Sequence, residues 1–351
     1  MSERSGLSQR VAFHGSVRWE RLDRRDGDLV VADSDARGVA DCRAGDVVVN
    51  EPRIRRQELD AVRDAIREIR PRRVIGVGGG CAIDAARLAW LDACDSAVVP
   101  LVVAPCGREL WRAFAPFAVV LESEGSQATT ADRRLAGHDV VIDGSLIDTV
   151  DDDTLLLTAV DVLVATIESL LTRRAQPYSR AVANAAGLRL LPAVGAGIDG
   201  GRPDSDAVIV ASALAVEAFA STGLGLAHGI STNLAALLQV PQDRINAIGG
   251  RWVIGRWGEH PALAELRRTA ALTDGIERSL TELVDAAMSR LRLATLRHEG
   301  VTDGHVDVVL PRISQSSGIP WLPEKLGVDE IRRVVYDLCD PEATGVRTRL
   351  G

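Results

Sequence analysis

The stretch GVGGGCAIDAAR, residues 76–87, decides the fold of the N-terminal half of the chain. An apolar run at residues 74–77 leads into its glycines, and an apolar pattern with helical spacing continues to residue 91. Glycines directly after a strand let the backbone approach a pyrophosphate, and the N-terminus of the next helix offers free N–H groups to its negative charge. The stretch therefore predicts a nucleotide site between a strand and a helix. A tight strand-to-helix turn without a ligand is the alternative.

Further strands and helices alternate around this stretch. Short apolar runs at residues 28–33 and 45–50 are typical of buried parallel strands, and residues 55–70 carry apolar side chains at helical spacing. This order predicts a doubly wound, Rossmann-like parallel sheet. The second half has helical periodicity. We therefore expect an N-terminal α/β domain over residues 1–150 and a C-terminal all-α domain over residues 151–351.

Composition limits the classes of function. The chain has 351 residues, 46% of them hydrophobic, which is enough to bury a core in each of two domains. Its formal net charge of −8 argues against nucleic acid as a partner, because such partners call for clustered basic residues. The five cysteines form no C-x-x-C pair, the N-terminus has no apolar signal core, and no uncharged apolar run is long enough to span a bilayer. We expect a cytoplasmic protein with no membrane partner.

Several segments resemble motifs of the iron-containing alcohol dehydrogenase and dehydroquinate synthase-like superfamily, and together they span most of the chain. The glycine stretch is similar to G-G-G-S-x-x-D-x-A-K, with Cys81 for serine and Arg87 for lysine. Residues 318–328, GIPWLPEKLGV, are similar to the closing element G-I-P-x-x-L-x-x-L-G-V. Residues 105–119, PCGRELWRAFAPFAV, align without a gap to P-T-T-A-G-T-G-S-E-x-T-P-F-A-V. The resemblance implies an NAD-dependent oxidoreductase with the two-domain fold expected above.

The segments that supply metal ligands in that family are altered here. Residues 159–168, AVDVLVATIE, are similar to the helix G-x-D-A-L-x-H-A-x-E, but Ala165 replaces its histidine. His228 matches a family ligand in L-G-x-x-H-A-x-x-H, whereas Gln242 replaces the histidine of P-H-G-x-x-N-A. A divalent metal needs three or four N, O or S ligands, and Asp161 and His228 supply two. We expect no tightly bound metal, with Asp161, His228 and Gln242 as the vestige of the site. A weaker site completed by neighbouring side chains or water is the alternative.

By resemblance, the NAD site comprises Gly78, Gly79, Gly80 and Asp84. Asp33 ends the strand that carries, in the family, the acidic residue at the adenosine ribose. A carboxylate there accepts hydrogen bonds from a free 2′-hydroxyl and repels a 2′-phosphate, which favours NAD over NADP. First-turn helix capping is the alternative for Asp84, and a solvated position at the end of the strand is the alternative for Asp33.

The resemblance also assigns the catalytic centre, with His228, Thr232 and Asp161 as the candidate residues. Thr232 replaces a second histidine that lies near the nicotinamide in the family, so its hydroxyl could contact the substrate but is a poor base. An ordinary buried threonine bonded to its own helix is the alternative.

Residues 105–119 depart from the family in another way, because large and charged side chains replace small ones. Arg108 or Arg112 could bind a substrate carboxylate through a bidentate fork. The alternative is that these arginines pair with Glu109 or face solvent.

Without a metal, oxidation of a hydroxyl needs another way to stabilise negative charge, or a product that is removed irreversibly. A β-hydroxy acid offers the second route, because its β-keto product readily loses carbon dioxide. The chain is similar to metal-site-degenerate members of the superfamily in daptide-type peptide biosynthesis, which implies oxidation and decarboxylation of the C-terminal threonine of a ribosomal precursor peptide. The expected partners are a small-molecule or peptide C-terminal substrate, a precursor-peptide-recognition protein and further copies of the chain in a homo-oligomer. A metal-dependent alcohol or polyol dehydrogenase and a non-catalytic nucleotide- or partner-binding relative are the alternatives.

Overall fold

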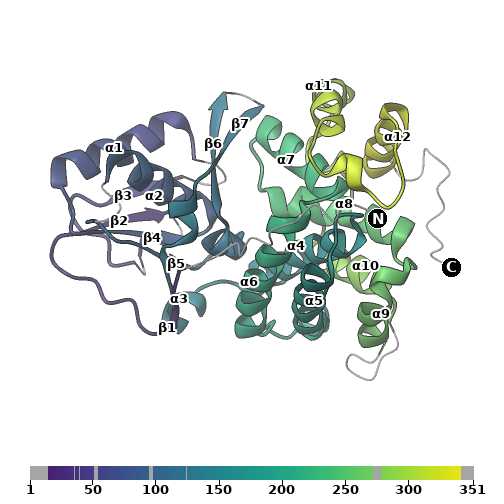
Figure 1. The fold of residues 1–351 in the computed structure, drawn as a ribbon, viewed down its shortest axis with the longest axis horizontal. Coiled ribbons are helices and arrows are strands. Elements are labelled where there is room, and N and C mark those ends of the chain that lie inside the picture. The colour runs from purple at the N-terminus through teal and green to yellow at the C-terminus, as the bar shows by residue number, and fades with distance from the viewer. Residues whose placement is uncertain are drawn as a thin grey trace, which may run out of the picture.

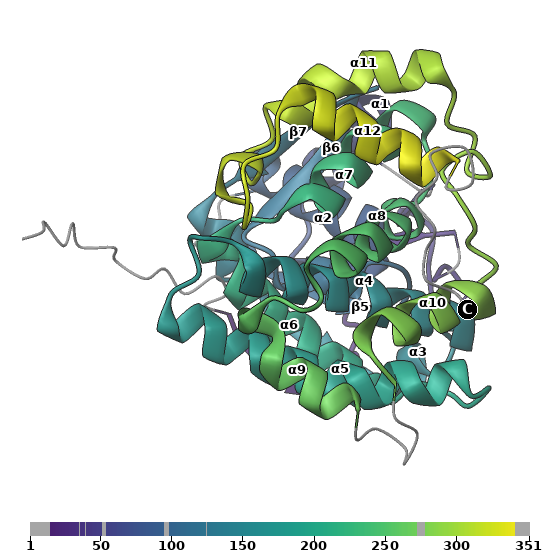
Figure 2. The ribbon, with the colours of Figure 1, turned by 90° about the vertical axis from the view of Figure 1, so that its right-hand side faces the viewer.

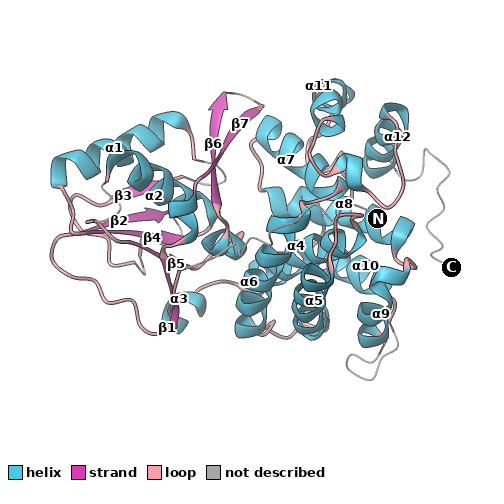
Figure 3. Ribbon diagram, viewed as in Figure 1, coloured by secondary structure: helices cyan, strands magenta, loops and turns pink. Residues whose placement is uncertain are grey.

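The computed structural model describes residues 15–340, apart from residues 35, 39, 51–53, 95–97, 124 and 272–277. Strands gather in one half of the molecule and helices make up the other half (Figure 1, Figure 3). The described strands end at Ile142, and the long helices begin at Asp152. The predicted fold class, a parallel α/β sheet followed by an all-α part, is confirmed. The domain boundary at residue 150 stays a prediction.

Six parallel strands form the sheet, in the order β1-β8-β5-β4-β2-β3. They are β1 (Val17–Trp19), β2 (Asp28–Asp33), β3 (Val47–Val49), β4 (Arg73–Gly78), β5 (Leu101–Pro105) and β8 (Asp139–Ile142). Strand β4 lies between β2 and β5, and all three run in the same direction. Their carboxyl ends therefore bring Asp33, Gly78 and Pro105 to one edge of the sheet, where the sequence predicts the nucleotide site.

Three helices accompany the sheet: α1 (Arg56–Ile69), α2 (Gly80–Ala93) and the short α3 (Gly144–Ile147). Helix α2 packs so closely against β4 that a Cβ atom on Gly76 would lie only 2.9 Å from the Cβ of Ala86. Its residue Arg87 is fully buried, and the Arg87 guanidinium donates to four backbone carbonyls, those of Arg112, Ala115, Phe117 and Leu135. Arg87 thus bonds the chain that follows β5 to helix α2, which packs on the sheet.

An antiparallel ribbon and two 3-10 helices complete this half. The ribbon consists of β6 (Phe117–Ser123) and β7 (Ser126–Ala131), and the 3-10 helices are η1 (Leu110–Phe114) and η2 (Arg133–Ala136). Figure 1 shows the ribbon on the side of the sheet that faces the helical half. The segment between β5 and β6 therefore runs along the junction of the two halves.

The elements of the helical half are α4 (Asp152–Leu171), α5 (Pro177–Ile198), α6 (Ser205–Thr222), α7 (Leu226–Leu238), α8 (Gln242–Trp257), η3 (Pro261–Leu263), α9 (Ala264–Ala270), α10 (Leu280–Arg290), α11 (Asp303–Ser314), η5 (Ile319–Trp321) and α12 (Val328–Cys339). Helix α4 packs against α5, α6 and α8. In Figure 2, α11 and α12 lie at one end of this half, and α5 and α9 lie at the other.

Within the described residues, three helices are long and apolar enough to cross a membrane by length and composition alone, namely α4, α5 and α6. The apolar part of α4 is 94% buried inside the protein, and the corresponding parts of α5 and α6 are 50% buried. Burial at the centre of the helical half accounts for the apolar composition of α4. The expectation of no membrane partner stays a prediction.

Candidate active site

The segment of residues 106–114, here called the bridging segment, connects the two halves of the protein. On one side, the amide of Cys106 donates to the carbonyl of Gly78, and the amide of Gly80 donates to the carbonyl of Arg108, both at 3.0 Å. On the other side, Arg108 bonds Asp243 at the start of α8. Gly78, Gly79 and Gly80, here called the glycine loop, and the helical half therefore both contact this segment.

The glycine loop and Asp33 lie together, as the cofactor hypothesis requires. Asp33 is 3% exposed, and its carboxylate accepts hydrogen bonds from the amides of Gly79 at 2.6 Å and Ala36 at 2.8 Å. Gly78 has φ +134, and a Cβ there would lie 2.1 Å from Oδ2 of Asp33, so only glycine fits. A solvated position for Asp33, the alternative weighed above, is wrong because the carboxylate is buried. Its contact with a ribose stays a prediction.

The structure does not support the predicted roles of Asp84 and Arg112. Arg112 is 2% exposed and is held between two carboxylates, donating to Asp84 at 2.6 Å and to Glu109 at 2.7 Å. Asp84 also accepts from the amide of Val119 at 3.0 Å, so it neither caps α2 nor faces an open nucleotide site. A guanidinium that already neutralises two buried carboxylates is not available to clamp a substrate, and the pairing of Arg112 with Glu109 is the alternative that holds.

Arg108 remains a candidate for ligand binding. Its side chain is 31% exposed and donates from one nitrogen to both carboxylate oxygens of Asp243, at 2.9 and 3.1 Å. Asp243 is fully buried, and burial raises its pKa to about 7 despite the attraction of Arg108, with the charges of Glu109 and Asp161 acting in the same direction. The partly exposed side chain of Arg108 is thus held by a carboxylate whose charged form burial disfavours, and an incoming acid could replace that carboxylate.

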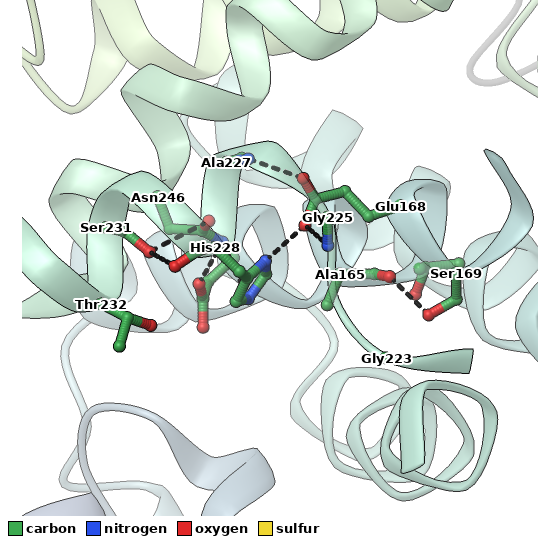
Figure 4. Close-up of polar contacts among 12 residues, drawn as sticks. Ala165, Glu168, Ser169, Gly223, Gly225, Ala227, His228, Ser231, Thr232 and Asn246 are labelled. Atoms are coloured by element: carbon green, nitrogen blue, oxygen red, sulfur yellow. Dashed lines mark hydrogen bonds and ion pairs between the residues drawn. The ribbon is translucent and has the colours of Figure 1, made fainter. Parts of the chain in front are cut away.

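Asp161 and His228 are both buried, and Figure 4 shows His228 among the polar contacts of this part of the helical half. Asp161 accepts from the indole N–H of Trp111 at 2.9 Å and from the amide of Asn246 at 2.7 Å. The same amide nitrogen lies 3.3 Å from Nε2 of His228. Burial raises the pKa of Asp161, and the charge of Glu109 adds to this effect. Asn246 therefore occupies the space between the two side chains that the sequence singled out as metal ligands.

Glu168 orients His228 from the other side. Its carboxylate accepts from Nδ1 of His228 at 2.8 Å and from the amides of Gly225 at 2.9 Å and Ala227 at 2.7 Å, at the start of α7. Burial lowers the pKa of His228, but the bond to Glu168 and the charges of Glu168 and Asp161 outweigh it and raise that pKa. Glu168 thus fixes the ring and makes it more basic.

Sequence reasoning missed Trp111, Glu168 and Asn246 as members of this cluster. Glu168 carried a signal, because it lies seven residues after Asp161 and hence on the same face of one helix. The indole of Trp111 also packs edge-on against Phe219, with ring centroids 5.6 Å apart. No sequence signal placed this indole on Asp161.

The side chains present do not fit a tightly bound divalent metal. Ala165 has no donor atom on its side chain, and the amide nitrogen of Gln242 donates to the hydroxyl of Thr232 at 3.0 Å. Across the part of the chain that the structure describes, no group of three or more His, Cys, Asp and Glu side chains is placed to hold a metal ion. The low metal content expected of the purified protein stays a prediction, which only elemental analysis tests.

Thr232 lies four residues after His228 on the same helix, α7. Figure 4 draws it away from the bonds that link His228 and Glu168. Its hydroxyl accepts from Gln242, whereas the neighbouring Ser231 contacts Asn246. A catalytic role for Thr232 stays a prediction.

The chain is similar in sequence to known dehydrogenases. It is 27% identical over 194 residues to the probable alcohol dehydrogenase EutG of Escherichia coli, covering 50% of this chain and 49% of the relative. It is 21% identical over 301 residues to the NADPH-dependent butanol dehydrogenase of Clostridium saccharobutylicum, covering 77% of each chain. The matched part spans about half the length of EutG. No protein-family model matches the chain.

Solved structures share the fold over nearly the whole chain. The iron-containing alcohol dehydrogenase of Corynebacterium glutamicum has a TM-score of 0.77 at 16% identity, covering 97% of this chain and 98% of that one. The sulfoacetaldehyde reductase of Bifidobacterium kashiwanohense, solved with NAD+, has a TM-score of 0.75 at 17% identity, covering 95% and 100%. This protein has the fold of the solved iron-containing alcohol dehydrogenases, and the curated relatives to which it is similar are named as dehydrogenases.

Proposed function

We propose that the protein is an NAD-dependent oxidoreductase that interconverts a hydroxyl and a carbonyl group on a small acid without a tightly bound metal. The observation that carries the proposal is the placement of three features along one bridging segment: the glycine loop with Asp33, the partly exposed side chain of Arg108, and the Asp161–His228 cluster. The dehydrogenases and reductases among its relatives support the reaction class.

NAD would be held by Gly78, Gly79 and Gly80 at the N-terminus of α2, with Asp33 beside them. When bound, the nicotinamide accepts or donates a hydride at the substrate carbon. In the described conformation the bridging segment covers these glycines, so it must withdraw for the dinucleotide to bind.

The side chains of the cluster supply the proton chemistry. His228 is the candidate base, because Glu168 holds Nδ1 and raises the pKa of the ring. Trp111 and Asn246 donate N–H bonds to Asp161 in this conformation, and a substrate oxygen that displaced the Asp161 carboxylate would gain these donors for its negative charge. These donors take the place of the polarising metal in the proposal.

The acid group of the substrate would bind Arg108 in place of Asp243. One structural neighbour is named for an anionic substrate, sulfoacetaldehyde, which is compatible with a cationic group at this site. The finer form of the proposal is a β-hydroxy acid, including a peptide with a C-terminal threonine. Hydride and proton removal there gives a β-keto acid and NADH, and loss of carbon dioxide leaves a ketone.

The direct test is binding of NAD and NADP by calorimetry, followed by turnover of β-hydroxybutyrate and of a short peptide that ends in threonine. We expect NAD to bind better than NADP, because Asp33 lies beside the glycine loop. If neither dinucleotide binds, the protein is not a dehydrogenase of this kind. Turnover that requires an added divalent metal would instead favour the metal-dependent alcohol dehydrogenase.

The role of Arg108 gives a separate prediction. Replacing Arg108 by Ala should weaken binding of β-hydroxybutyrate by about 1.5–3 kcal/mol, the range for hydrogen bonds to charged groups. The amide β-hydroxybutyramide should bind the unmodified protein about as poorly, and the two changes together should cost much less than their sum, because both remove one contact. Arg67→Ala, at an exposed site on α1, is the control. Equal loss of acid and amide binding in Arg108→Ala would indicate a structural effect and contradict the clamp.

A further inference from the structure

The glycine loop is closed by groups of the protein itself. Gly78, Gly79 and Gly80 are all buried. The amide of Gly79 donates to the carboxylate of Asp33, and the amide of Gly80 donates to the backbone carbonyl of Arg108. These N–H groups are the ones that a pyrophosphate at the start of a helix would need.

The side chain of Glu109 lies directly over this loop. A Cβ atom on Gly80 would lie 2.7 Å from Oε2 of Glu109 and 2.7 Å from Cδ of Arg112. Arg112, the cation nearest to Glu109, is shared with Asp84. The carboxylate of Glu109 therefore lies at the N-terminus of α2, where the helix favours an anion. A dinucleotide phosphate at this position would clash with the Glu109 side chain and would be repelled by its negative charge.

The backbone of Glu109 is strained in this position. Glu109 has φ +55, in the left-handed region that side chains other than glycine rarely adopt. The bonds of Arg112 to Glu109 and of Arg108 to Asp243 hold the segment on both sides of this residue. Its neighbours thus hold Glu109 in a strained backbone conformation, with the carboxylate at the place where an anion would bind.

We propose that Glu109 is the residue that limits dinucleotide binding: its carboxylate occupies the phosphate position at the glycine loop and must withdraw with the bridging segment before the dinucleotide binds. The proposal rests on the proposed function, because it concerns the same cofactor. Glu109 competes with the dinucleotide for the same site, so the apparent affinity of the unmodified protein for NAD is its intrinsic affinity multiplied by the fraction of molecules in which the segment is open.

The test is the dissociation constant of NAD+ measured by calorimetry for the unmodified protein, Glu109→Gly and Glu109→Gln. Glu109→Gly removes the carboxylate and the backbone strain, and we expect NAD+ to bind at least about tenfold more tightly. Glu109→Gln keeps the side chain but removes its charge, so its affinity should lie between the other two. Arg292→Gly is the matched control, because Arg292 has φ +54 in the turn after α10 and relief of its strain should leave NAD+ affinity unchanged.

A second measurement follows the segment directly. Hydrogen–deuterium exchange of residues 106–114 in the unmodified protein should rise when NAD+ is added, because the bonds of the segment to the glycine loop are lost. Equal NAD+ affinity in the unmodified protein and in Glu109→Gly, or unchanged exchange with NAD+ bound, would overturn the proposal and leave the proposed function standing. No NAD+ binding by any of these folded variants would overturn both.

Discussion

Replacing Arg87 by Met should lower the free energy of unfolding by about 3–5 kcal/mol, the cost of breaking a buried charged network from one side. Arg87 is fully buried, and burial lowers its pKa to about 10, so the guanidinium stays charged at neutral pH. It donates to the carbonyls of Arg112 at 2.9 Å, Phe117 at 3.0 Å and Leu135 at 3.1 Å, and also to Ala115. Methionine fills a similar volume but removes the guanidinium donor from these carbonyls, although the carbonyl of Arg112 still accepts from the amide of Ala115 at 3.1 Å.

Denaturant unfolding measures this effect. Arg87→Lys should cost less, because an ammonium donates up to three hydrogen bonds but cannot reproduce the planar fork. Arg67→Met, at an exposed position on α1, is the control and should change stability by less than about 0.5 kcal/mol. If Arg87→Met is as stable as Arg67→Met, Arg87 does not hold the segment between β5 and β6 in place.

Replacing Glu168 by Ala should cost about 3–5 kcal/mol, because it leaves the buried donors of His228, Gly225 and Ala227 without an acceptor. The pKa of His228 should also fall, since burial lowers it and the carboxylate of Glu168 raises it. Glu168→Gln keeps the shape of the side chain but turns an amide N–H group toward one of these donors. It should therefore lower the pKa of His228 as Glu168→Ala does, with a smaller loss of stability.

Denaturant unfolding and an NMR titration of His228 separate the two effects. Glu68→Ala, at an exposed position on α1, is the control for stability. In a functional enzyme, the lower pKa of His228 should shift the acid limb of the pH–rate profile to lower pH. An unchanged pKa of His228 in Glu168→Gln would show that Glu168 does not tune the ring.

The fold could be predicted from the sequence because its signals are local. The strand at residues 28–33 is predicted by a short run of apolar residues, and the turn after β4 is predicted by the conformational freedom of its glycines. Both signals lie in neighbouring residues of the sequence. The absence of a ligand atom on the side chain of Ala165 is equally local, because an alanine side chain offers no donor atom in any fold.

The arrangement of the charged groups could not be predicted in this way. Arg108 and Arg112 lie four residues apart, yet one reaches Asp243 in the helical half and the other reaches Asp84 in the sheet half. Their partners depend on how the bridging segment packs between the halves. The position of Asn246 against Asp161 also arises only when α4 and α8 meet.

The central claim is that the Asp161–His228 site works without a tightly bound metal, and elemental analysis by mass spectrometry of the purified, NAD-active protein tests it most directly. Two candidate ligands, Asp161 and His228, with Asn246 between them lead us to expect well under one equivalent of iron or zinc per chain. The same sample should oxidise its substrate equally well before and after treatment with a chelator. One equivalent of metal per chain, lost together with activity on chelation and lowered by Asp161→Ala, would contradict the account.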